Sequence, residues 1–185
     1  MEFLPTLWFI LIAVLWIGYL VLDGFDLGVG MLLKGWAKNE SQRRVLLNTI
    51  GPVWDGNEVW LITAAGATFA AFPHWYASMF AGLYIPLTFT LLALILRAVS
   101  IEYRGKSHSQ TARNLWDWCM AGGSFMAAFG IGAMLALTST GLPLDEHGDR
   151  VGGPFVWFNG WAVLGGLSVV GIAFAMGWAF LSLKT

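Results

Sequence analysis

Five long apolar segments dominate this sequence of 185 residues, and each is about as long as a helix that crosses a membrane. A spanning helix needs about 20 largely apolar residues. In lipid, only helices and closed barrels satisfy their own backbone hydrogen bonds, and no strand-like alternation is present. The sequence therefore predicts an all-α integral membrane protein, a single transmembrane domain over 1–185. The predicted spans are approximately 5–30, 53–72, 77–98, 115–138 and 157–182.

Composition supports the same class. Charged residues make up only 11% of the chain and hydrophobic residues 57%, whereas about a quarter of a soluble domain is charged. The net charge of −1 argues against nucleic-acid binding, which needs a basic excess. We expect this chain to be surrounded by membrane lipid.

The basic residues are distributed unevenly between the connections. Arg150 stands alone among the connections on one side of the predicted bundle, beside acidic residues. The positive-inside rule then places the N-terminus outside and the C-terminus in the cytoplasm. The other nine basic residues would share the cytoplasmic side: Lys34, Lys38, Arg43, Arg44, Arg97, Arg104, Lys106, Arg113 and Lys184.

Ionisable residues also interrupt three of the apolar segments. Asp23 and Asp26 fall in the inner half of the first segment, and Asp55 and Glu58 lie at the start of the second. The third segment ends with Arg97. In the predicted orientation all five lie at similar depth near the cytoplasmic side. Residues three apart share a helix face, so each carboxylate pair is expected to point one way.

Two interpretations of these carboxylates remain open. Ionisable residues inside a membrane usually mark an ion or proton pathway. Alternatively, Asp55 could stabilise the positive end of its helix dipole, and Asp26 could reach the membrane interface. Trp54 and Trp60 lie beside Asp55 and Glu58 and could either shape such a pathway or pack between helices.

The glycines of the first segment favour helix packing. Gly24 and Gly28 form a GxxxG pair, which lets two helices approach closely in lipid. A dinucleotide-binding fingerprint would need a further glycine at position 33, where Leu33 stands, and a preceding strand.

No metal or haem site is predicted within this chain. Its histidines, His74, His108 and His147, all lie in predicted loops, and Cys119 is its only cysteine. Methionines occur in the spans, but methionine in an apolar helix is usually a packing residue.

Three runs of the sequence resemble subunit II of bacterial cytochrome bd quinol oxidases. They are LDGFDLGVGML, RRVLLNTIGPVWDGNEVWLITAAGATFAAFP and ILRAVSIEYRGK. The WDGNEVWL block is highly specific, and the order of the three runs matches the family. The resemblance covers about residues 3–118, and NLWDW with the later apolar spans continues it more weakly.

The resemblance implies an integral subunit of a terminal oxidase in the bacterial inner membrane, which oxidises quinol and reduces O2 to water. Haems b and d are then expected in the partner, subunit I, and none in this chain, which would not itself be catalytic. Subunit II would support the assembly of subunit I and the supply of cytoplasmic protons. Small accessory subunits are further expected partners, and some members hold a structural quinone.

Residue roles also follow from the resemblance. The positions that match Asp23, Asp26, Asp55 and Arg97 deliver protons toward the haems in this family. The position that matches Trp60 lies near a proposed oxygen route. Family members have about eight spans, so we expect these five to be part of a longer subunit.

A proton-coupled transporter or channel component is the alternative function. A carboxylate–arginine cluster would serve it equally well. Such a transporter more often shows paired broken helices in two related halves, and the sequence contains no such pair.

Overall fold

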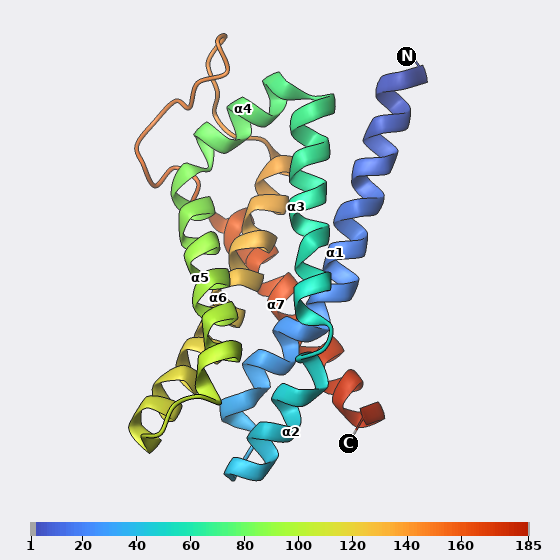
Figure 1. The fold of residues 1–185 in the computed structure, drawn as a ribbon. Helices are drawn as coiled ribbons and strands as arrows, with labels where there is room; N and C mark the ends of the chain where they lie inside the picture. Colours follow the sequence, from blue (N-terminus) through green and yellow to red (C-terminus); the bar gives the residue numbers. More distant parts are fainter. Residues whose placement is uncertain (1–2, 185) are drawn as a thin grey trace.

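The computed structural model describes residues 3–184, which form a bundle of helices (Figure 1). In this part of the chain there is no β-strand, only an isolated bridge between Leu144 and Arg150 in the loop before the last helix. The all-α prediction is therefore confirmed. The helices are α1 (Phe3–Gly35), α2 (Glu40–Ile50), α3 (Trp54–Ala71), α4 (Pro73–Gly82), α5 (Tyr84–Arg104), α6 (Gln110–Thr140) and α7 (Gly160–Lys184).

Four of the described helices, α1, α5, α6 and α7, are long and apolar enough to cross a membrane. Helix α3 runs alongside α1 (Figure 1). It is 18 residues long, but Asp55, Asn57 and Glu58 make its first turns polar. That α3 is a fifth span stays a prediction.

The third predicted segment, 77–98, falls on two helices in the structure. Helix α4 begins at Pro73, a favoured position because proline lacks the N–H that a first turn leaves unpaired. It ends at Gly82, and the backbone leaves helical geometry at Leu83 before α5 begins. The break turns α4 away from α5 at one end of the bundle (Figure 1).

Helix α2 lies in a stretch that the sequence analysis treated as a polar connection. The Asn39 side chain caps it by accepting a hydrogen bond of 2.9 Å from the backbone N–H of Gln42. Asparagine is among the best N-cap residues. On its apolar face Leu46 and Ile50 are buried in a cluster with Leu33 of α1. Helix α2 is therefore a short amphipathic helix that covers one end of the bundle.

Ion pairs fix α2 to the ends of α5 and α6. Arg104, the last residue of α5, donates hydrogen bonds to both carboxylate oxygens of Glu40, at 2.8 and 3.1 Å, and also to Asp117 of α6. Arg43 of α2 pairs with the other oxygen of Asp117 at 3.2 Å. Arg104 and Asp117 are both buried. Because an unpaired buried charge is costly, these contacts determine where α2 lies.

Helices α1 and α7 touch through their backbones at Gly28 and Gly177. A Cβ atom added at Gly28 would lie 2.0 Å from the carbonyl oxygen of Ala173 and 2.7 Å from the amide nitrogen of Gly177. A Cβ atom at Gly24 would lie 3.4 Å from the Met176 side chain, an ordinary contact. The GxxxG pair therefore faces α7, and Gly28 is the member whose missing side chain permits the close approach.

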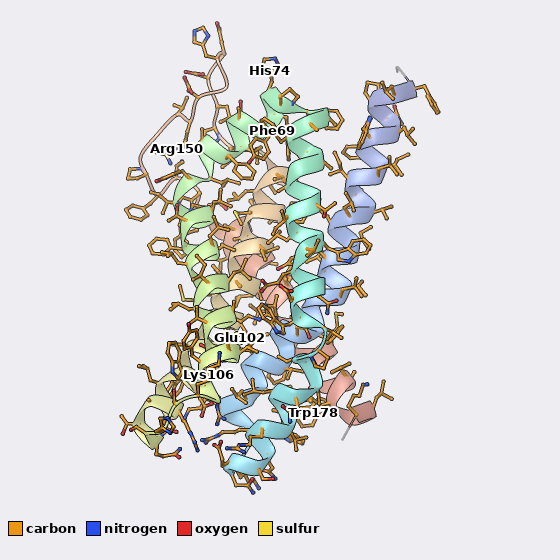
Figure 2. All side chains as sticks on the ribbon, viewed as in Figure 1. Phe69, His74, Glu102, Lys106, Arg150 and Trp178 are labelled. Atoms are coloured by element: carbon orange, nitrogen blue, oxygen red, sulfur yellow. The ribbon has the colours of Figure 1, made fainter. Side chains whose placement is uncertain are left out.

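Charged side chains separate to the two ends of the bundle. In Figure 2, His74 and Arg150 lie at one end, and Glu102, Lys106 and Trp178 lie toward the other. The C-terminus and α2 are also at this second end (Figure 1). Which end faces the cytoplasm stays a prediction from the charge distribution.

We expect Gly28→Ala to destabilise the bundle, because its methyl group would overlap the backbone of α7. Overpacking of this kind costs about 1–3 kcal/mol. Thermal unfolding of the purified protein in detergent measures the effect as a lower midpoint. Gly171→Ala in α7 is the matched control, since no atom lies within 4 Å of its added Cβ. Equal midpoints for the two variants would contradict this account of the crossing.

Docking of α2 is expected to weaken in acid. Hydrogen bonds from the Arg104 guanidinium hold the pKa of Glu40 below its usual value of 4.5. A carboxyl whose pKa is lowered by folding stabilises the fold above its unfolded pKa, and this stabilisation is lost as pH falls through the folded pKa. Wild type should therefore unfold at a higher temperature than Glu40→Gln at neutral pH, and the difference should disappear in acid. A difference that does not change with pH would contradict this.

Candidate functional site: a buried arginine–carboxylate cluster

Arg97 lies at the centre of the candidate site. It belongs to the buried face of α5, which also contains Ala93, Ser100 and Arg104 at helical spacing. The Arg97 side chain is 0% exposed. A guanidinium cannot lose its proton in a protein, so burying one requires anionic partners.

Two helices supply those partners. Arg97 Nη2 donates to Asp23 Oδ1 of α1 at 3.0 Å, and Nη1 donates to Glu58 Oε1 of α3. Asp23 is fully buried, whereas the Glu58 side chain is 21% exposed. The guanidinium thus joins α1, α3 and α5. Of its two partners, Glu58 is the one that is partly exposed at the surface of the chain.

A third carboxylate, Asp26, has a neutral partner. The Asn57 amide donates to Asp26 Oδ2 at 2.7 Å and to the carbonyl oxygen of Leu22 at 3.0 Å. Asp26 is 0% exposed, and within residues 3–184 the ion pairs of Arg97 go to Asp23 and Glu58 instead. The cluster therefore contains three carboxylates and one arginine.

Several buried polar atoms of the cluster have no hydrogen-bond partner among the described residues. They are Tyr19 Oη, Asp23 Oδ2, Asp26 Oδ1 and Arg97 Nε. Buried polar atoms in proteins are normally paired with protein groups or with ordered water.

The structure brings together four of the five ionisable residues predicted for this site: Asp23, Asp26, Glu58 and Arg97. The fifth, Asp55, lies on the exposed side of α3, and among the described residues Arg97 forms its ion pairs with Asp23 and Glu58 instead.

The two flanking tryptophans lie on either side of this helix turn. Trp60 packs against α1 at Gly18, where an added Cβ would lie 2.4 Å from its ring. Trp54, in the first turn of α3, is half-buried. Trp60 therefore has a packing contact, and an oxygen route beside it stays a prediction.

Sequence reasoning missed two polar members of the cluster. Asn57 lies between Asp55 and Glu58 in the chain. It was missed because the prediction rested on ionisable residues, and an asparagine side chain is uncharged. Tyr19 precedes Asp23 by four residues, a spacing that places both on one helix face, and it is buried with the cluster. That spacing was the available signal.

The histidines lie outside this cluster. His74, His108 and His147 are all exposed. His74 lies in the first turn of α4, and the other two lie in loops between helices. In the described part of the chain, no group of three or more His, Cys, Asp or Glu side chains is placed to hold a metal ion. The described interior thus offers no histidine to a haem iron.

Comparison with known proteins identifies the family. A family model described as cytochrome bd terminal oxidase subunit II matches residues 4–185. Cytochrome bd ubiquinol oxidase subunit 2 of Bacillus subtilis (strain 168) is 45% identical over 185 residues, which cover all of this chain and 55% of that protein. Cytochrome bd-I ubiquinol oxidase subunit 2 of Escherichia coli (strain K12) is 40% identical over 188 residues, covering all of this chain and 50% of that protein.

A probable cytochrome oxidase subunit 2 of Haemophilus influenzae is 42% identical, again over all of this chain and 50% of that protein. The chain thus spans about half the length of the relatives it matches. Four apolar helices together with these matches indicate a multi-pass protein of the bacterial inner membrane. The chain belongs to the family of cytochrome bd terminal oxidase subunit II.

Proposed function

We propose that this chain acts within an integral subunit of a respiratory oxidase that oxidises quinol and reduces O2 to water, and that its buried cluster passes cytoplasmic protons toward the haems of the partner subunit. The observation that supports this is a single buried arginine facing three carboxylates, Asp23, Asp26 and Glu58. Family membership favours the oxidase role over the proton-coupled transporter.

The partner in this proposal is the haem-bearing subunit I, whose assembly this chain supports. The haems b and d of that subunit carry the electrons and the oxygen chemistry. Accessory subunits and a structural quinone belong to the same proposal.

Charge balance gives the cluster its capacity for protons. If all three carboxylates were ionised beside one guanidinium, two negative charges would remain uncompensated in a buried site. Burying unpaired charge costs several kcal/mol per ion. We therefore infer that the cluster can take up a proton, which would offset its excess negative charge and pass between its carboxyl groups.

The geometry suggests an order of transfer. Glu58 is the partly exposed member and would take up the proton, while Asp23 and Asp26 lie deeper. Arg97 holds one oxygen of Asp23, and Asn57 holds one oxygen of Asp26. The second oxygen of Asp26 has no hydrogen-bond partner among the described residues and would be the site that accepts a proton. Asn57 and Arg97 would orient the carriers without carrying the proton themselves.

We expect Glu58→Gln to lower quinol-dependent oxygen uptake of the full-length oxidase complex by about tenfold or more, because a glutamine keeps the shape but cannot transfer a proton. Haem absorption, which reports assembly, should stay near normal. Glu102→Gln is the control, since it removes the same charge from an exposed position at the same end of the bundle (Figure 2). Full turnover in Glu58→Gln would contradict the proton role.

Asp55→Asn distinguishes the two interpretations of Asp55. If Asp55 collects protons at the exposed start of α3, the variant lowers oxygen uptake and leaves haem content near normal, which is the result we expect. If Asp55 only stabilises the N-terminus of α3 through the helix dipole, worth about 0.3–1 kcal/mol, thermal stability falls slightly and oxygen uptake is unchanged at every pH.

A further inference from the structure

Helix α5 carries two buried arginines, Arg97 and Arg104, on one face. They are seven residues apart, which is about two turns or about 10.5 Å along the helix. Each guanidinium binds carboxylates from two other helices. Arg97 joins α1 and α3, and Arg104 joins α2 and α6.

We propose that Arg104, with Glu40 and Asp117, is a positioning site for the proton-transfer cluster: it fixes α2, and through α2 the start of α3, so that Glu58 meets Arg97. This inference rests on the proposed function of that cluster. Neither Glu40 nor Asp117 would carry protons, and both would act through the position of Glu58.

The connection between the two sites is short. Only residues 51–53 separate the end of α2 from the start of α3. Backbone hydrogen bonds continue across this link, from Gly51 N–H to Leu47 O at 2.8 Å and from Val53 N–H to Ile50 O at 2.9 Å. A shift of α2 would therefore displace the first turns of α3. Glu58 belongs to the second of these turns.

Within the described chain, α3 packs mainly against α1 and α4, and the Glu58–Arg97 pair is its polar link to α5. The position of α3 relative to Arg97 thus depends on its packing against α1 and on its attachment to α2. Because hydrogen bonds weaken steeply with distance and angle, a small displacement would be enough to break the Glu58–Arg97 contact.

The charges around Arg104 favour the positioning of helices over the transfer of protons. Glu40 faces Arg104 of α5 and Arg113 of α6, with Arg44 on its own helix, and the hydrogen bonds from Arg104 lower its pKa. Asp117 faces two arginines, Arg104 and Arg43. With a cation for each carboxylate, this site needs no proton to balance its charge. The cluster around Arg97, in contrast, has an excess of carboxylates.

The test is made in the full-length oxidase complex. The Glu40→Gln variant removes the α2 carboxylate that pairs with Arg104. Oxygen uptake is measured against pH, with haem absorption as the assembly check. The charged groups that face Glu58 are Asp23 and Asp26 of α1 and Arg97 of α5, with Asp55 on its own helix. A Glu58 carboxylate displaced from Arg97 should exchange its proton less efficiently. We therefore expect severalfold lower turnover and a pH profile of oxygen uptake that differs from that of wild type.

Glu102→Gln is the matched control, because Glu102 lies on α5 two residues before Arg104 and its pair with Lys106 is exposed, with an N–O distance of 3.8 Å. Its pH profile should equal that of wild type. If Glu40→Gln does not assemble, Glu40→Asp keeps the charge on a shorter side chain, and its profile should differ from that of wild type by less. An assembled Glu40 variant with the wild-type profile would overturn the inference.

The result for Glu58→Gln separates this inference from the proposed function. If Glu58→Gln lowers turnover and the assembled Glu40 variants keep the wild-type profile, the cluster carries protons but Arg104 does not position it. If Glu58→Gln leaves turnover unchanged, the proton role itself fails, and the positioning role fails with it. A shifted profile for Glu40→Gln, together with a slow Glu58→Gln variant, supports both.

Discussion

The rest of the bundle is arranged around the burial of the Arg97 guanidinium. A permanent positive charge with no exposed surface is tolerated only where anionic partners reach it with good geometry, and here they come from α1 and α3. Three helices must therefore meet at one depth. Two contacts help to fix α1 in the bundle: its GxxxG face meets α7, and the apolar face of α2 packs against its C-terminal part.

Small residues determine how closely α1 can lie against its neighbours. Helices in lipid gain little from hydrophobic burial against each other, so close backbone contact and polar pairs provide much of their attraction. At Gly28 and Gly177 the two backbones meet directly. The same stretch of α1 carries Asp23 and Asp26, which are both buried and have their polar partners on α5 and α3.

The two arginines of α5 differ in the balance of charge around them. Around Arg104 the positive charges at least match the carboxylates, and that site joins helices. Around Arg97 the carboxylates are in excess, and buried oxygen atoms are left without partners in the described chain. This excess of carboxylates is the feature on which the proposed proton transfer rests.

The sequence by itself determined the helical membrane class, because long apolar segments with so few charges have no other stable form. It also singled out Asp23, Asp26, Asp55, Glu58 and Arg97, since ionisable residues in such segments are costly and few. It could not determine which carboxylate faces Arg97, because residues near one another along a helix reach different neighbours once the helices rotate and pack.

Tertiary structure decided those points. It turned Glu58 toward Arg97 and left Asp55 exposed, one helical turn earlier. It added Asn57 and Tyr19 to the cluster, and it made a docked helix of α2, whose pair between Glu40 and Arg104 joins residues 64 positions apart in the chain. Sequence patterns report the periodicity of a single helix. Pairing between helices depends on their rotation, depth and crossing, which only the packed bundle fixes.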